Sequence, residues 1–457
     1  MDNTKKYLIL IVLLAGILLV TPTLVRMLGN NPYIINSQAY HNMRIYEQGS
    51  INYDSLQGHS IELNILNLLR LNDTGKYILF NIVPLILGLL TVILAYLVLK
   101  KHNITEKVIL AILSLVIVSP IFLYAFTDFK TYSFLIFLNV LGLYFLSDNK
   151  TLFSSITFSI IPFIDLYASI MTLMLLLVYM FAVGKKHAGN KITIFVTLAA
   201  IIFGVIINTY YGYNIWHIFQ FESQNIITDI GADIGVSFSV FIMAIIGLVL
   251  LWENGWRNLV TYVLLILFVI LSFLSVTTRI YISFILAIYA GFAFIYLNRR
   301  KWSITIIKKT TILLIICSIF FSTLVYNTRI VRSVPDQEYI DALTFVQKQA
   351  LESETILAYP AYGYMTEYYT NRRVLVDDET KYYDKARADA LDTIAASRNL
   401  DRTEKILKEY NIKYVIIDTD FQTYLADKEG LLYLIDTSQK FTSIYKNDKV
   451  EVWMYTE

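Results

Sequence analysis

The chain has few of the charged residues and cysteines that soluble proteins use to stay dispersed or to cross-link their folds. Of its 457 residues only 16% are charged, 56% are hydrophobic, and the mean hydropathy is +0.56. A chain this apolar is excluded from the ordinary class of water-soluble globular proteins. Cys317 is the single cysteine, so no disulfide can form within the chain.

Sequence motifs of soluble enzymes are also missing. The sequence contains no nucleophile elbow, no Walker loop, no dinucleotide-binding fingerprint and no metalloprotease helix. Reactions that depend on those motifs therefore have no support here.

What the chain does contain is a series of long apolar runs, several of which reach the roughly 20 residues that a helix needs to cross a bilayer. We predict about eleven crossings, at residues 7–28, 77–99, 108–126, 131–147, 152–164, 166–184, 192–210, 235–252, 258–276, 279–297 and 310–326. The stretch 152–184 could instead be one crossing, because Pro162 and Asp165 divide a single apolar run. The first span lacks a small-residue cleavage site after a short apolar core, so we expect it to be retained as a signal anchor.

Basic residues give the orientation of these spans independently. They recur in every second connection, at Lys5, Lys6, Lys100, Lys101, Lys107, Lys150, Lys185, Lys186, Lys191, Arg257, Arg299, Arg300, Lys301, Lys308 and Lys309. The positive-inside rule makes those connections cytoplasmic. We therefore expect a multi-pass protein of the plasma membrane with its N-terminus inside and, for an odd number of spans, its C-terminal part outside.

Two exterior parts of the chain are long enough to fold. In the first exterior loop, 29–76, the side chains of Ala39, Tyr40, Met43 and Tyr46 recur at helical spacing, which predicts a helix along the membrane surface. A second, nearly apolar stretch at 61–69 predicts another. We divide the chain into a transmembrane domain, 1–329, which includes this loop, and an exterior domain, 330–457.

The exterior domain alternates helical and strand patterns, which predicts a small α/β fold. We expect a helix over 335–350, strands at 355–359, 373–376 and 413–417, and a closing hairpin of 440–446 and 449–455. From residue 330 onward there are 16 basic and 23 acidic side chains. Because this domain is mildly acidic, we do not expect nucleic acid as a partner.

Acidic residues of the membrane part gather toward the predicted exterior. Nine of its 13 lie there: Glu47, Asp54, Glu62, Asp73, Asp128, Asp165, Glu222, Asp229 and Asp233. Carboxylates at the ends of spans are costly unless they are hydrated, paired or bound to metal, so this gathering suggests a functional cavity. The alternative is a set of solvated loop acids. Asp128 and Asp229 are the stronger candidates, because each adjoins an apolar span.

Two other kinds of exterior side chain could bind a ligand. His41, His59 and His217 could form a zinc site with Asp54, but no two of them have the close helical spacing of a zinc motif. Arg279 opens a span that is otherwise free of charge until its cytoplasmic end. Its guanidinium could hold a lipid phosphate, or it could merely extend to the membrane interface.

Several segments resemble the GT-C membrane glycosyltransferases, in particular archaeal relatives of the oligosaccharyltransferase catalytic subunit. Asn36-Ser-Gln-Ala-Tyr-His-Asn-Met-Arg44 is similar to the first-loop pattern of that family, in which an acid precedes Ala-Tyr-Tyr-His-Leu-Arg, and 49–56 is similar to the stretch after it. The segments 119–133 and 228–235 resemble two later exterior loops of the family. Residues 354–378 resemble the start of its C-terminal domain, with Tyr362-Gly363-Tyr364.

The resemblance implies a GT-C-like fold and transfer of a sugar from a polyprenyl-linked donor to an exterior acceptor. It implies a catalytic Asp54 and Asp128, with Asp54 as base. A Mg²⁺ or Mn²⁺ would be held by Asp229 and Asp128. The substrate-binding residues that it implies are Arg279, which would grip the lipid phosphate, Gln38, Arg44 and Tyr362.

Two departures from the family pattern limit the resemblance. Gln38 stands where the family has its first-loop carboxylate, and an amide is neither a general base nor a good ligand for a hard cation. Tyr359-Pro360-Ala361 stands where the oligosaccharyltransferase has Trp-Trp-Asp. Because the aspartate that would recognise the acceptor is absent, we do not expect glycosylation at sequons.

Three hypotheses therefore remain. The first is a glycosyltransferase that uses a polyprenyl-linked sugar, with a glycan or protein acceptor that the sequence does not name. The second is a non-catalytic GT-C relative that binds lipid-linked glycan or acts as a scaffold in cell-envelope assembly, which Gln38 favours. The third is a transporter, which is disfavoured because transporters place polar residues at mid-membrane depth.

Overall fold

The computed structural model describes residues 3–29, 31, 33–34, 37–48, 73–183, 188–210, 227, 229, 235–252, 259–377, 380 and 384–456. Predictions for Asp54, Glu62, Glu222, Asp233, His59 and His217, and for the stretch 61–69, lie outside these residues. The chain forms two compact units. Among the described residues, one unit lies within 3–25 and 73–331, and the other within 26–48 and 332–456.

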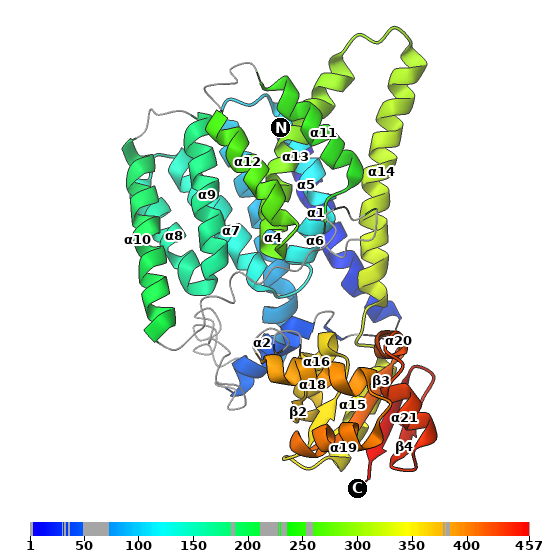
Figure 1. Ribbon diagram of the computed structural model, residues 1–457. Helices are drawn as coiled ribbons and strands as arrows, with labels where there is room; N and C mark the ends of the chain where they lie inside the picture. The colour runs from blue at the N-terminus through cyan, green and yellow to red at the C-terminus, as the bar shows by residue number, and fades with distance from the viewer. Residues whose placement is uncertain are drawn as a thin grey trace. The chain divides into compact units, whose positions relative to one another are not determined.

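The first unit consists of helices, which Figure 1 labels. They are α1 (Asn3–Leu28), α4 (Asp73–Lys101), α5 (Glu106–Ile117), α6 (Pro120–Phe126), α7 (Thr131–Ser147), α8 (Thr151–Ile164), α9 (Leu166–Val183), α10 (Ala188–Tyr210), α11 (Phe238–Leu250), α12 (Leu259–Ser272), α13 (Val276–Arg299) and α14 (Thr305–Arg332). Every predicted span coincides with one of these helices, or with two at 108–126, to within a few residues. Hydrophobic runs alone therefore located the helices.

Helix length leaves the number of crossings open. Within the described residues, four helical stretches are long and apolar enough to cross a membrane: Lys5–Leu28, Leu79–Lys101, Val276–Arg299 and Thr305–Gln349. The bent pair α5 and α6 raises the number to five, and six apolar helices are shorter. The chain is thus a mostly helical protein with several apolar spans, and the count of eleven stays a prediction.

Proline accounts for the bend in the predicted crossing at 108–126. The axes of α5 and α6 differ by 64°. Ser119 has extended backbone angles, and Pro120 is the first residue of α6. A proline clashes with a helical conformation at the preceding residue but suits the first helical position. The chain therefore leaves one helix and immediately starts another.

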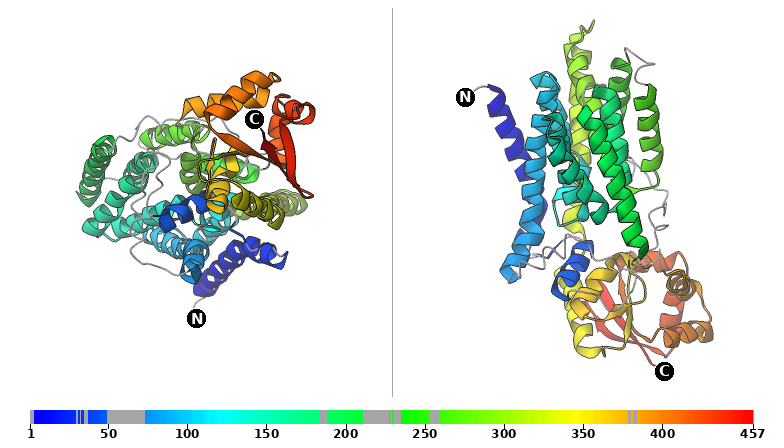
Figure 2. Two further views of the ribbon diagram at one scale, coloured as in Figure 1. Left: turned by 90° about the horizontal axis from the view of Figure 1, so that it is seen from below. Right: turned by 90° about the vertical axis from the view of Figure 1, so that its left-hand side faces the viewer.

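The uncertain stretch 152–184 contains two helices that meet at Asp165. This residue is extended, and its carboxylate accepts a hydrogen bond of 2.8 Å from the backbone N–H of Ala168, which caps the start of α9. Figures 1 and 2 show α8 and α9 beside α10. The local sequence thus separates two packed helices at the aspartate, three residues after Pro162.

The second unit is an α/β fold around a five-stranded sheet of order β2-β1-β3-β5-β4. The strands are β1 (Thr355–Leu357), β2 (Arg373–Val374), β3 (Ile412–Asp418), β4 (Phe441–Lys446) and β5 (Val450–Tyr455). The first three are parallel, and β4 and β5 form the predicted antiparallel hairpin at the edge. Leu357, Val415, Ile417, Phe421 and Leu407 belong to its apolar core.

Helices of the second unit come from both ends of the chain. They are α2 (Ser37–Gln48), α15 (Gln337–Gln349), the 3₁₀ turn η3 (Pro360–Tyr362), α16 (Gly363–Thr370), α18 (Lys385–Ala396), α19 (Leu400–Glu409), α20 (Thr419–Ala426) and α21 (Leu431–Thr437). The helix predicted in the first exterior loop is present as α2, but its apolar face packs against α16. Ala39 and Tyr40 are buried there, so the prediction that this face lies on the membrane surface is wrong.

Candidate functional site

Asp128 lies in the short connection between α6 and α7 and is 3% exposed. Its Oδ1 is 2.6 Å from the ammonium of Lys130, which is also buried. Lys130 in turn donates a hydrogen bond of 2.8 Å to the Tyr124 carbonyl and lies 3.8 Å from the centre of the Tyr124 ring. The second carboxylate oxygen, Oδ2, is buried and accepts no hydrogen bond from the described part of the chain. One oxygen of Asp128 therefore pairs with a cation, and the other has no donor within the described residues.

Burial of Asp128 and Lys130 affects the pKa of the lysine. Desolvation lowers the pKa of Lys130, whereas the charge of Asp128 raises it, and desolvation has the larger effect. A buried ion pair recovers its desolvation cost only when further hydrogen bonds satisfy it. The Tyr124 carbonyl and ring supply that support to Lys130. Oδ2 of Asp128 lacks it, which is the kind of unsatisfied buried group that marks functional sites.

Asp229 has a different environment, at the start of α11. Its Oδ2 accepts hydrogen bonds from the Phe238 N–H at 2.7 Å and from the Ser237 hydroxyl at 3.3 Å. Its Oδ1 accepts a hydrogen bond from the Ser322 hydroxyl of α14. The aspartate also lines an open depression together with Phe238, Cys317 and Phe321. Asp229 therefore links α11 to α14, and both of its oxygens have donors from the protein itself.

Arg279 occupies the first turn of α13 and is 1% exposed. Its guanidinium is therefore buried, and both roles predicted for it, binding of a lipid phosphate and extension to the membrane interface, stay predictions. Next to it, the Thr278 hydroxyl is 2.7 Å from the hydroxyl of Tyr167 on α9. The start of α13 is thus a polar, buried region between helices.

In the second unit, α2 is joined to α16 by a buried ion pair. Arg44 donates a hydrogen bond to the Glu367 carboxylate, with side chains 2% and 8% exposed. The Tyr40 ring packs 5.4 Å from that of Tyr368 and 5.3 Å from that of Tyr369. Gln38 lies one turn before His41 on the same helix. These contacts fix the part of the first loop that resembles the family pattern.

His41 should make the second unit less stable in acid. Its ring lies 4.3 Å from that of Tyr364, and burial, assisted by the charge of Arg44, lowers its pKa from 6.5 to about 3. Below pH 6.5 the unfolded chain binds a proton here that the folded chain does not, so the free energy of unfolding falls as pH falls from 6.5 toward 3. The slope is at most about 1.4 kcal/mol per pH unit.

Thermal unfolding of the full chain at pH 7.5 and pH 4.5 measures this effect. His41→Phe keeps the ring contact and cannot be protonated, so its loss of melting temperature between the two pH values should be smaller than that of the wild type. Equal losses would contradict the assignment to His41.

A second group of polar residues lies at the carboxyl ends of the parallel strands, where α/β sheets commonly bind ligands. Tyr362 follows β1 and donates a hydrogen bond to Asp420, which follows β3. Asp418 caps α20 by accepting from the N–H groups of Asp420 and Phe421, and burial raises its pKa to about 6. Asp377, after β2, is 1% exposed. Burial and then Asp420 raise the pKa of Tyr362, so its hydroxyl stays protonated and can donate.

The donor set does not fit a divalent metal when only the described residues are counted. No group of three or more His, Cys, Asp or Glu side chains among them could hold a metal ion. At Asp128 the ammonium of Lys130 already neutralises one oxygen, and at Asp229 serine hydroxyls and a backbone amide serve both oxygens. Asp54 and two of the three exterior histidines lie outside the described residues.

Lys130, Glu367 and Asp418 were missed by the sequence interpretation. For Lys130 a signal existed, because it is a basic residue in a connection that the positive-inside pattern assigns to the exterior. Glu367 and Asp418 gave none, since an acid in a mixed α/β sequence is normally on the surface.

The chain has the fold of solved GT-C membrane glycosyltransferases, and at 10–12% identity the likeness is one of fold alone. The oligosaccharyltransferase AglB of Archaeoglobus fulgidus, solved with a tethered acceptor peptide, matches with a TM-score of 0.60 and 10% identity over 99% of this chain and 74% of AglB. AglB with an inhibitory peptide and a dolichol-phosphate matches with a TM-score of 0.58 and 12% identity, over 100% and 75%. AglB has also been solved with Zn and sulfate.

A second similar structure is ArnT from Cupriavidus metallidurans bound to undecaprenyl phosphate, with a TM-score of 0.52 and 10% identity over 98% of both chains. The predicted resemblance is thus confirmed at the level of the fold. No family model and no curated protein matches the sequence.

Proposed function

We propose that this chain is a multi-pass membrane glycosyltransferase that moves a sugar from a polyprenyl phosphate or diphosphate to an acceptor on the exterior face. The observation that supports it most is the buried Asp128 and Lys130 pair, at the ends of apolar helices in a chain with the GT-C fold. The ligands solved in AglB and ArnT are a dolichol-phosphate and undecaprenyl phosphate. Such a phosphate would need cations near it, and Lys130 and Arg279 are candidates.

The proposal includes the topology predicted from the sequence. The N-terminus is cytoplasmic, the chain crosses the membrane about eleven times, and the exterior domain comprises 330–457. The part of the first loop that contains α2 joins the exterior domain, as the division into two units supports.

In the proposed transfer, the acceptor hydroxyl oxygen bonds to the anomeric carbon of the sugar, and the bond from that carbon to the phosphate oxygen breaks. The electron pair leaves with the polyprenyl phosphate, whose charge Lys130 and Arg279 offset. The hydroxyl proton passes to a carboxylate, either Oδ2 of Asp128 or the predicted base Asp54. The metal roles predicted for Asp229 and Asp128 stay predictions, as do the substrate contacts of Gln38 and Tyr362.

For Arg44 we propose a positioning role in place of the direct substrate contact that the sequence resemblance implies. Its partner Glu367 and its burial support a positioning function, in which it acts on substrate only through the placement of α2. Ala361, next to Tyr362, stands where the oligosaccharyltransferase has the aspartate that would recognise the acceptor. Its presence supports an acceptor other than a sequon.

Removing the charge of Asp128 should abolish most of the transfer. In liposomes that contain a polyprenyl-phosphate-linked radiolabelled sugar, Asp128→Asn should lower the rate of polyprenyl phosphate release by about 10²- to 10⁴-fold, the range of a general acid–base group. The matched control is Asp148→Asn. Asp148 forms its ion pairs with Lys101 and Lys150 at the far end of α7, where the side chains are at least 30% exposed.

Four outcomes test these assignments. Equal rates for Asp128→Asn and the wild type would overturn the role of Asp128, and an active Asp54→Asn would overturn that of Asp54. If Arg279→Ala leaves the affinity for the lipid donor unchanged, the phosphate role of Arg279 fails. Donor binding without any turnover in the wild type would instead establish the non-catalytic relative that Gln38 favours.

A further inference from the structure

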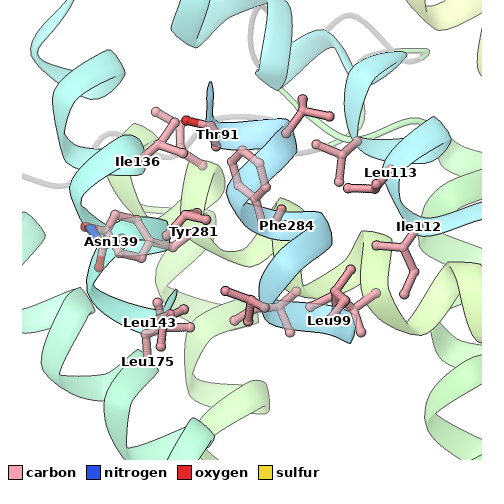
Figure 3. A pocket seen from close by; sticks show the side chains of 18 residues that line it. Thr91, Leu99, Ile112, Leu113, Ile136, Asn139, Leu143, Leu175, Tyr281 and Phe284 are labelled. Atoms are coloured by element: carbon pink, nitrogen blue, oxygen red, sulfur yellow. The ribbon is translucent and has the colours of Figure 1, made fainter. Parts of the chain in front are cut away.

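An apolar cavity of about 140 Å³ lies inside the helical unit, away from Asp128 and Asp229. Figure 3 shows its lining side chains, which come from α4, α5, α7, α9 and α13. Leu99, Ile112, Leu143 and Phe284 are typical of them. The cavity is partly open, so a ligand can enter without unfolding the helices around it.

The few polar side chains in its wall already have hydrogen-bond partners within the protein. Asn139 donates to the Tyr281 hydroxyl at 2.8 Å and accepts from the Thr172 hydroxyl at 2.9 Å. Tyr281 donates to the Ala168 carbonyl at 3.2 Å, and Thr91 donates to the Leu87 carbonyl at 2.7 Å. Water needs two to four polar partners to stay in a cavity, and this wall offers none that is uncommitted. The occupant that fits is a hydrocarbon.

Size and energy favour a bound occupant over an empty space. An engineered protein cavity of about 150 Å³ binds benzene, so this one holds roughly six carbon atoms. An empty cavity destabilises the structure around it in proportion to its volume, so filling this one should raise the melting temperature of the helical unit.

The position of the cavity relative to charged residues indicates which lipid could supply this hydrocarbon. Leu99 lines the cavity directly before Lys100 and Lys101, at the helix end that we propose to be cytoplasmic. Lys100 is exposed, its ammonium lies 3.5 Å from the Tyr96 hydroxyl, and it pairs with no carboxylate in the described chain. Asp128 precedes the opposite end of α7, whose first residue, Thr131, lies about 12 to 18 Å along the helix from Asn139 and Leu143.

We propose that this cavity binds a segment of roughly six carbon atoms from one acyl chain of an anionic phospholipid of the inner leaflet, whose headgroup phosphate contacts Lys100. The leaflet assignment rests on the proposed topology, but the chain-binding site does not. The cavity also reaches Ile280, next to Arg279, where we propose that the donor phosphate binds, so the donor lipid is the competing occupant that the experiment must distinguish. The phospholipid therefore serves as a structural ligand that fills the space between α4, α7 and α13.

Ala95 provides the variant that tests the proposal, because it lines the cavity with the smallest side chain there. Ala95→Leu adds three carbon atoms inside the cavity. Val140→Met, on α7, adds volume from another wall and remains informative if the first variant folds poorly. Ala199→Leu, on an exposed position of α10, is the matched control for an added leucine.

The full chain would be purified in digitonin, which has no alkyl chain to fill the cavity, and bound phospholipid would be counted by native mass spectrometry. We expect the wild type and Ala199→Leu to keep one phosphatidylglycerol, and Ala95→Leu and Val140→Met to bind it at least tenfold more weakly. Adding dioleoyl phosphatidylglycerol should raise the melting temperature of the wild type and not that of Ala95→Leu. Lys100→Gln should weaken binding of phosphatidylglycerol without changing binding of the zwitterionic phosphatidylcholine.

Unchanged retention in both cavity variants would overturn the proposal. So would a wild type that is stabilised by undecaprenyl phosphate and not by phosphatidylglycerol, since the cavity would then hold the donor chain. Failure of the glycosyltransferase assay alone has no bearing on this result, because retention and melting are measured without a sugar donor.

Discussion

Arg44→Ala is expected to destabilise the second unit by about 3–5 kcal/mol, because it leaves the carboxylate of Glu367 buried without its cation. Arg44 and Glu367 are 323 positions apart in the sequence and nearly inaccessible to solvent. Glu367 also accepts from the backbone N–H of Val374 in β2, at 3.4 Å. The pair therefore links α2, α16 and the edge of the sheet.

The measurement is thermal unfolding of the full chain, with hydrogen exchange of the amides in α2 and α16. Exchange in these two helices should accelerate in Arg44→Ala, whereas exchange in α13 should not change. The matched control is Arg398→Ala, which breaks an exposed pair with Glu429 and should cost less than about 1 kcal/mol. A double variant, Arg44→Met with Glu367→Leu, should recover most of the stability, because it removes both buried charges.

Equal melting temperatures for Arg44→Ala and Arg398→Ala would contradict the importance of the buried pair. Reduced sugar transfer by Arg44→Ala in an assay at low temperature, where the chain stays folded, would add a functional result. We expect the effect to appear in the turnover number through misplacement of α2, and Arg44→Lys to rescue part of it.

Local sequence patterns predicted the elements of this fold well and their partners poorly. Apolar runs located helices such as α7 and α13 because a span must be continuous and apolar whatever it packs against. The hairpin of β4 and β5 was also predicted from local sequence, because the residues that connect the two strands, at Asn447, favour a turn. The bend at Pro120 was visible in the sequence, but the angle of 64° depends on the packing of α6.

The candidate site was harder to predict because its chemistry depends on pairs of residues. Asp128 was identified from its position beside an apolar span, whereas the cation beside it, Lys130, was missed. Arg44 was identified from a motif, and its actual partner lies in the other half of the chain. The amphipathic pattern of α2 was real, but a hydrophobic face can be covered by protein as well as by lipid, and periodicity does not distinguish the two.

Gly247→Ala should disrupt the packing of α11 against α13. A Cβ at this position would lie 2.0 Å from the carbonyl oxygen of Tyr289 and 2.6 Å from its carbonyl carbon. These are backbone atoms of α13, so no side-chain rotation relieves the contact, and the two helices must separate. Small residues permit such close backbone approach between membrane helices.

We expect a loss of about 3 kcal/mol or more, at the upper end of overpacking effects. The comparison is Gly16→Ala in α1, where the nearest atom to a new Cβ is a Leu89 methyl at an ordinary 3.8 Å. Both positions are glycines in apolar helices, so alanine gives each the same gain in helix propensity, about 1 kcal/mol. A difference in melting temperature between them therefore measures the helix contact itself, and the absence of one would show that α11 and α13 do not approach as closely as the structure places them.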